Sequence, residues 1–204
     1  MLCPHGVIVA LEVFMEIVLE IMLGIALAAA CGFRVFVPML VISIAALSGH
    51  LQLSGGFEWL GTWPALVVFA VATVLEIAAY YIPWLDHLFD SVAGPAAVVA
   101  GIVAASSVMH GMEPWLKWTL AVIAGGGAAG IVQGLTTVTR LASTATTGGL
   151  GNPVVATGEA AGAVGLSVLA VALPVAAFCA VMIVLFLTVR WGVRRLRREK
   201  AASP

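Results

Sequence analysis

The stretch that decides the fold of this chain reads E-I-A-A-Y-Y-I-P-W-L-D-H-L-F-D-S-V-A-G-P and runs from Glu76 to Pro95. It places acidic residues between two segments that are apolar enough to lie in lipid. Glu76 falls about two-thirds of the way along the apolar run that Pro83 ends, and Asp86 and Asp90 follow one helical turn apart. A charge at such depth costs roughly 2.5 kcal/mol or more, so it usually faces a bundle interior or an aqueous cavity. The stretch therefore predicts the polar centre of a membrane protein.

The composition predicts the same class of protein. Of the 204 residues, 62% are hydrophobic and 9% are charged, whereas soluble domains have about 25% charged residues. We expect an all-α, polytopic transmembrane helix bundle in one domain over residues 1–189, followed by a basic tail over 190–204. The net charge of −1 offers no basic face to nucleic acid. Cys3, Cys31 and Cys179 form no C-x-x-C pair, so neither a disulfide framework nor a thiolate metal site is expected.

The first apolar segment, residues 7–30, is long enough to cross about 30 Å of hydrocarbon. It carries Glu12, Glu16 and Glu20, which share one helical face because they recur every fourth residue. This stripe either faces a partner helix or water at the membrane edge, or it belongs to an ion path.

Five to six spans are expected, with broken or re-entrant segments near residues 31–48 and 140–158. After the break at Arg34, the second apolar run has only about 13 residues, or about 19 if it reaches residue 53, so it is a short span or a re-entrant half-helix. From Arg140 the chain is rich in Thr, Ser and Gly, which predicts an irregular stretch that lines a cavity or lies at the surface. The final apolar run, residues 159–189, is expected to kink at Pro174.

The basic residues predict the orientation. Six of the nine Lys and Arg residues lie from Arg190 onward, so the positive-inside rule places the C-terminus in the cytoplasm. If the second segment spans fully, there are six spans and the N-terminus is also inside. If it is re-entrant, there are five and the N-terminus is outside. Six is the preferred number.

Small residues predict close helix packing. Gly126, Gly130 and Gly134 recur every fourth residue, the small-x-x-x-small pattern of tight contact between membrane helices. The span that follows Pro95 is rich in Ala and Gly. Together these surfaces also predict a homo-oligomer.

Three motifs resemble a known family. They are G-I-A-L-A-A-A-C-G-F-R-V-F-V-P over residues 24–38, E-x6-P-x2-D-x3-D over 76–90, and G-N-P-V-V-A-T-G-E over 151–159. Together they resemble the uncharacterised integral membrane family called Domain of Unknown Function 4126, over nearly the whole chain from about Gly24. The resemblance implies a small polytopic protein of the bacterial cytoplasmic membrane and brings no established activity.

The candidate site consists of the charged and polar residues at the segment breaks. The carboxylates of Glu76, Asp86, Asp90 and Glu159 suit a hard cation or a proton relay. The side chains of Arg34 and Arg140, together with backbone N–H groups of residues 148–151, suit a phosphate or a carboxylate. Because isolated charges are costly in a bundle, we expect at least one arginine to pair with one of these carboxylates. The residues of this transport path or ion-pairing site are Arg34, Glu76, Asp86, Asp90, Arg140, Asn152 and Glu159.

Two hypotheses for the function follow. The first is a small transporter or channel for a small cation or coupled to protons, because intramembrane charges commonly form such paths. The alternative is a non-transporting structural or assembly subunit, or a binder of an anionic lipid headgroup. An enzyme is not expected, since no Ser or Cys nucleophile comes with a motif-placed His. No cofactor or metal is assigned, and the expected partners are the lipid bilayer, a second copy of the chain, and a small ion or anionic lipid.

Overall fold

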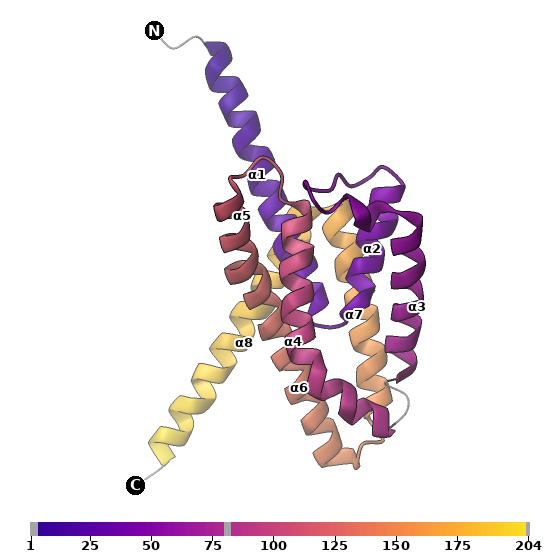
Figure 1. Ribbon diagram of the computed structural model, residues 1–204. Coiled ribbons are helices and arrows are strands. Elements are labelled where there is room, and N and C mark those ends of the chain that lie inside the picture. Colours follow the sequence, from indigo (N-terminus) through magenta and orange to yellow (C-terminus); the bar gives the residue numbers. More distant parts are fainter. Residues whose placement is uncertain (1–3, 80–82, 203–204) are drawn as a thin grey trace.

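The computed structural model describes the backbone of residues 4–79 and 83–202, and the side chains of residues 8–79, 92–191 and 194. Throughout the described residues the fold is a bundle of helices (Figure 1), as the composition predicts. A short 3₁₀ turn, Glu58–Gly61, lies between the second and third helices. The helices are α1 (Pro4–Cys31), α2 (Phe36–Leu47), α3 (Trp63–Ala79), α4 (Pro83–Val108), α5 (Pro114–Leu120), α6 (Gly127–Thr147), α7 (Asn152–Ala172) and α8 (Pro174–Ala202).

The first two helices form a hairpin that does not cross the bundle. α1 enters from the upper end of Figure 1 and stops inside the bundle, where residues 32–35 turn the chain, and α2 returns to the upper end. α3 then descends and α4 ascends, and both views show the start of α1 and the end of α8 at opposite ends of the molecule. The second segment thus pairs with α1 and returns to the end from which α1 enters. Opposite ends for the two termini do not fit the preferred six-span interpretation, which puts both termini on one side.

α5 and α6 make one long descending helix. They are joined by a π-helical stretch, Ala121–Gly126, so the helix continues from Pro114 to Thr147. The irregular region predicted from Arg140 onward is accordingly confined to residues 148–151. The Thr and Ser side chains before it bond to carbonyls of the preceding turn, for example Thr146 Oγ1 to Ala142 O at 2.8 Å. Their hydroxyls are thus satisfied within the helix, which allows it to continue.

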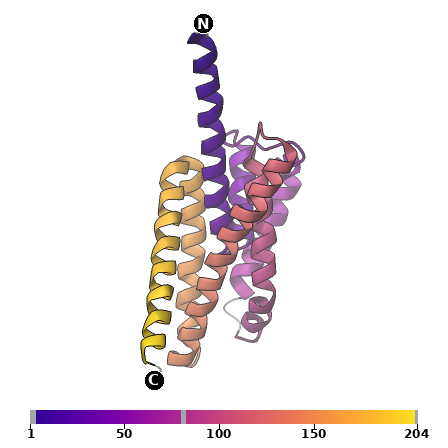
Figure 2. The same ribbon diagram turned by 90° about the vertical axis from the view of Figure 1, so that its left-hand side faces the viewer.

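α7 and α8 form the last hairpin. α7 ends at Ala172, and Pro174 is the first residue of α8, where its missing N–H and fixed φ are favourable. Figure 2 shows the two helices side by side and joined at the upper end. The kink expected at Pro174 is therefore wrong, because the chain reverses its direction there.

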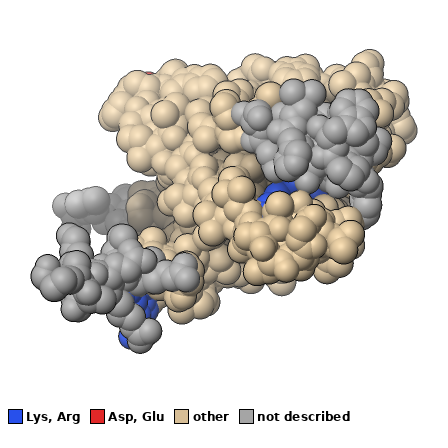
Figure 3. Space-filling view, turned by 90° about the horizontal axis from the view of Figure 1, so that it is seen from below, with Lys and Arg blue, Asp and Glu red and all other residues tan. Residues whose placement is uncertain are grey.

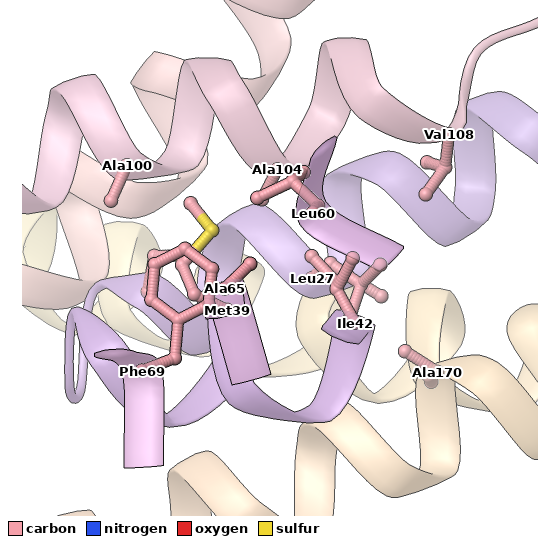
Figure 4. Close-up of a cluster of buried hydrophobic side chains, with 13 residues drawn as sticks. Leu27, Met39, Ile42, Leu60, Ala65, Phe69, Ala100, Ala104, Val108 and Ala170 are labelled. Atoms are coloured by element: carbon pink, nitrogen blue, oxygen red, sulfur yellow. The ribbon is translucent and has the colours of Figure 1, made fainter. Parts of the chain in front are cut away.

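Small side chains allow the helices to pack closely. Ala26 to Cys31 of α1 are fully buried, and α4 presents Ala97, Ala104 and Ala105 without exposed surface. The larger buried side chains, among them Leu27, Ile42, Leu60 and Phe69, fill the space between α1, α2, α3 and α4 near the upper end (Figure 4). The close packing predicted for the Ala-rich span after Pro95 is confirmed.

The outer surface is apolar enough for lipid. In the described residues, four helical stretches are long and apolar enough to cross a membrane: Ile8–Cys31, Pro114–Thr147, Asn152–Ala172 and Pro174–Trp191. Shorter apolar helices cover Phe36–Leu47, Trp63–Ala79 and Val92–Val108. The outward face of α3 consists of exposed valine and leucine side chains, at Val67, Val68, Val71, Val74 and Leu75. A surface of this kind is stable in hydrocarbon, so the fold is that of a helical membrane bundle.

Candidate functional site

The turn between α1 and α2 lies deep in the bundle because Gly32 allows a close approach to α6. A Cβ atom at this glycine would lie 2.6 Å from the carbonyl oxygen of Ala129 and 2.6 Å from Cβ of Val132. No side chain fits at those distances. Contact with α6 thus fixes the turn and, with it, the position of the next two residues, Phe33 and Arg34.

Glu76 of α3 caps the start of α2. Its Oε1 accepts the backbone N–H of Val35 at 2.8 Å, and its Oε2 accepts that of Phe36 at 3.1 Å. The first N–H groups of a helix have no partner inside the helix, and the helix dipole favours a negative charge at this end. Glu76 is only 5% exposed. Its carboxylate therefore replaces the water that would otherwise satisfy these N–H groups.

Glu159 of α7 lies between two arginines that come from different segments. Arg140 of α6 donates from Nε to Oε1 at 3.0 Å and from Nη2 to Oε2, so the pair is bidentate. Arg34 reaches Oε2 with its Nη2 at 3.3 Å, and the same nitrogen donates to the carbonyl of Ala156 at 2.9 Å. The ion pairing expected for the arginines is thus present. We call Arg34, Glu76, Arg140 and Glu159 the buried charge network.

All members of the network are almost completely buried. The exposed fractions of the side chains are 1% for Arg34, 7% for Arg140 and 5% for Glu159. Removing one partner of such a buried pair typically costs about 3–5 kcal/mol, because the remaining charge is left uncompensated. The network therefore holds α6, α7 and the α1–α2 turn in their mutual arrangement.

Each charged residue continues the buried stripe of its own helix. On α6, Arg140 follows Ala129, Val132 and Thr136 at helical spacing. On α7, Glu159 lies in register with Ala156, Ala163, Ser167 and Ala170, and on α3, Glu76 lies in register with Ala65, Phe69 and Thr73. A charge in register with small buried residues must point into the bundle. This signal is present in the sequence, and it distinguishes these charges from Glu12 and Glu16, which are exposed on α1.

The network lies nearer to the lower end of the bundle. Arg140 precedes the end of α6 by seven residues and Glu159 follows the start of α7 by seven, each about 10 Å along a helix. From Glu159 to the other end of α7 the distance is about 20 Å by the same measure. Figure 3 views the lower end, where basic atoms are visible among the other described residues.

Of the other three predicted residues, only Asn152 has a side chain that the structure describes. Asn152 lies at the start of α7, where its Nδ2 donates to Thr144 Oγ1 at 3.1 Å. Asp86 and Asp90 belong to α4, but their side chains lie outside the described residues. Nor do the glycines of the α6–α7 turn present the predicted N–H groups to the arginines. The N–H of Gly148 donates to Thr144 O and that of Gly151 to Thr147 Oγ1.

Sequence reasoning missed a second polar cluster at the upper end. Glu20 of α1 accepts the backbone N–H of His110 at 2.7 Å and contacts its Nδ1 at 3.0 Å. Lys117 of α5 donates to Ser54 Oγ at 2.9 Å, and its ammonium lies 5.5 Å from the ring centre of Phe57. We call these residues the upper clasp, because they tie α1 and the two upper loops together. The every-fourth-residue spacing marked Glu20, but nothing in the sequence gave its partner.

A metal site is not formed by the side chains that the structure describes. No group of three or more His, Cys, Asp or Glu residues lies together among them. Of the site carboxylates, Glu76 bonds to backbone N–H groups and Glu159 to guanidinium groups. Both described carboxylates of the site are thus engaged by N–H donors.

Comparisons with known proteins agree with the three sequence motifs. The comparisons with curated proteins and with solved structures return no match. The model of one family, described as "Domain of unknown function (DUF4126)", matches residues 21–194. This range contains the whole buried charge network, the α1–α2 turn and the α6–α7 turn. The chain therefore belongs to the DUF4126 family.

Proposed function

We propose that this protein is a small transporter that couples the passage of a solute to protons. The observation that supports this is the position of Glu159, a buried carboxylate shared by Arg34 and Arg140. This one carboxylate contacts two guanidinium groups that belong to different segments, so a change in its charge affects both contacts.

A change in the charge of Glu159 would act on the fold around it. When the carboxylate takes up a proton, both ion pairs lose their attraction, and the two arginines are left close together in a poorly hydrated site. Arg34 belongs to the α1–α2 turn and Arg140 to α6, whereas Glu159 belongs to α7. Protonation therefore favours a separation of these three elements. Two arrangements whose balance depends on a proton are what a coupled transporter needs.

The geometry favours a proton over a metal cation as the coupling ion. A cation bound at Glu159 would lie beside two guanidinium groups, which repel it. A cation at Glu76 would have to displace the two backbone N–H groups that cap α2. A proton needs no coordination shell and no open space.

The orientation follows from the charges of the chain. Under the positive-inside rule, the basic residues from Arg190 onward support an orientation with the lower end in the cytoplasm of a bacterial cell. The buried charge network is then closer to the cytoplasmic face than to the outer face.

Proton flux in proteoliposomes tests the proposal. The purified protein is reconstituted with an entrapped pH dye, and sodium, potassium, phosphate or acetate gradients are imposed in turn. We expect the wild type to move protons with at least one of these solutes and Glu159→Gln, which removes the charge but keeps the shape, to lose that flux. Glu113→Gln serves as the matched control, because Glu113 is exposed and precedes α5.

Two results would contradict the proposal. Equal flux in the wild type and in folded Glu159→Gln would separate transport from the network. If the wild type moves no proton with any of these solutes, the structural or assembly role gains support, since a fully paired network also suits a static bundle.

A further inference from the structure

We propose that Arg34 and Arg140 form a binding site for one oxyanion group, a carboxylate or a phosphate, which takes the place of the Glu159 carboxylate. Only the statement that the bound anion is carried across the membrane rests on the proposed transport function. Binding itself is a property of the folded protein and is tested without transport.

The two guanidinium groups already hold an oxyanion. Arg140 contacts both oxygens of Glu159 with Nε and Nη2, the paired geometry in which arginine recognises carboxylates and phosphates. Arg34 approaches one of the same oxygens, and its Nη2 is held in place by the carbonyl of Ala156. Glu159 thus occupies the position of a ligand whose oxygens bridge two arginines.

The charges of the described network allow the exchange when a proton accompanies the anion. Arg34 and Arg140 contact Glu159 directly, and Glu76 bonds to the backbone N–H of Val35, the residue next to Arg34. An added anion would leave the site with an extra negative charge. If a proton first forms an O–H bond on Glu159, its two ion pairs are lost and the anion bonds to the freed N–H groups. The net charge then stays unchanged, and release reverses both steps.

The groups that face Glu159 are known for the described side chains. Arg34 faces it from the α1–α2 turn and Arg140 from α6, while Glu76 of α3 lies beyond them at the start of α2. Asp86 and Asp90 of α4 lie outside the described side chains. Both arginines attract an incoming anion, and Glu76 stays bound to the N–H groups of α2 during the exchange.

The position of the network indicates the route of the anion. Toward the upper end, the space between α1, α2, α3 and α4 is filled by the apolar cluster of Leu27, Ile42, Leu60 and Phe69 (Figure 4). Toward the lower end, the network is about 10 Å from the ends of α6 and α7, and basic atoms are visible from that side (Figure 3). The anion is therefore expected to reach the arginines from the lower end.

Equilibrium binding tests the site. The full-length protein is placed in phosphatidylcholine nanodiscs, and binding of radiolabelled inorganic phosphate and of acetate is measured at neutral pH. Glu159→Gln removes the competing charge, so it should bind at least one of these anions roughly tenfold more tightly than the wild type, since more of the protein is then competent to bind. Arg140→Lys keeps the charge but loses the paired contact, and added to Glu159→Gln it should abolish the gain. Glu113→Gln should match the wild type.

A second arm distinguishes a free anion from a lipid headgroup. The same variants are placed in nanodiscs that contain phosphatidylglycerol, and lipid retained on the protein is measured by native mass spectrometry. Retention that rises in Glu159→Gln and falls in the double variant, with no binding of phosphate or acetate, would assign the site to a lipid phosphate. Binding of free phosphate or acetate with the same dependence would assign it to a soluble anion.

The outcomes separate this inference from the proposed function. Arginine-dependent binding without any proton flux would keep the oxyanion site and end the transport function. Proton flux without arginine-dependent binding of phosphate, acetate or phosphatidylglycerol would do the opposite. If Glu159→Gln does not fold, the thermal midpoint of the wild type and of Arg140→Lys is measured with added phosphate, acetate or phosphatidylglycerol. A rise with none of them in the wild type, or equal rises in both proteins, would overturn the inference.

Discussion

Arg34, Arg140 and Glu159 illustrate why charges can be stable inside this bundle. Each side chain is at least nine-tenths buried, yet each has a partner of opposite charge within the network. Glu76 is satisfied differently, by backbone N–H groups instead of a cation. The two carboxylates therefore have different tasks: Glu159 joins segments, and Glu76 fixes the start of one helix.

This difference leads to a prediction for Glu76→Gln. The amide oxygen of Gln can accept from one of the two N–H groups at the start of α2, while its NH₂ group would face the other. We expect a loss of about 1–3 kcal/mol in the free energy of unfolding, the usual cost of a buried donor without a partner. The thermal midpoint in nanodiscs measures it. Glu58→Gln is the matched control, since Glu58 also accepts a backbone N–H, from Gly56, but at an exposed position.

A Glu76→Gln protein as stable as the wild type would contradict the capping role. A midpoint lowered equally in Glu58→Gln would show that the loss does not depend on burial.

At the scale of the elements, the sequence predicted helices better than their pairing. The helical class, the break after Cys31 and the close packing of α4 were all expected. The sequence predicted that an arginine would pair with a carboxylate, but it did not predict which carboxylate. That pairing depends on how helices that are far apart in the chain pack together. The reversal at Pro174 was missed for a related reason. A 31-residue apolar run with a central proline fits a kinked helix as well as two short helices.

The sequence correctly predicted that glycines allow close contacts between helices, but it did not predict which glycine makes the closest contact. Gly126 and Gly130 do face α4, where added Cβ atoms would meet Ile102 and Val98 at 3.1 and 3.4 Å. The tightest approach of α4 to the long α5–α6 helix instead involves Gly101. A Cβ atom there would lie 2.6 Å from Cβ of Ala129 and 3.2 Å from the carbonyl of Gly125. Part of the surface that suggested a homo-oligomer is thus used within the chain.

This contact predicts opposite effects for two Gly→Ala substitutions. Gly101→Ala forces α4 away from α6 and should lower the free energy of unfolding by about 1–3 kcal/mol. Gly134→Ala is the matched control, because Gly134 has open space around it on the exposed side of α6. It should be neutral or stabilising by up to about 1 kcal/mol, through helix propensity. Thermal midpoints of both variants in the same nanodiscs give the comparison, and a Gly101→Ala protein with an unchanged midpoint would contradict the close approach.

At the scale of the whole molecule, the α1–α2 and α7–α8 hairpins determine which loops lie at the same end of the bundle. Because α1 and α2 enter and leave at the upper end, the loop over residues 48–62 lies at the end opposite to the α6–α7 turn. The upper clasp fixes this loop to α5 through Ser54 and Lys117. The orientation that we propose from the positive-inside rule has the upper end outside the cell and the α6–α7 turn in the cytoplasm.

Cysteine labelling distinguishes this orientation from the six-span alternative. In a background where Cys3, Cys31 and Cys179 are replaced by Ser or Ala, single cysteines are introduced as Gly55→Cys and Leu150→Cys. Gly55 has open space around it in the upper loop, and Leu150 is 87% exposed in the α6–α7 turn. A membrane-impermeable maleimide should label Gly55→Cys in intact spheroplasts and Leu150→Cys only in inverted vesicles, while the cysteine-free background stays unlabelled.

Six spans with a cytoplasmic C-terminus would give the reverse pattern, because the second segment would carry residue 55 to the inside. Between residues 55 and 150 the chain crosses the bundle three times, down through α3, up through α4 and down through the long α5–α6 helix. The two positions must then lie on opposite sides, so labelling of both from one side would contradict this arrangement of helices.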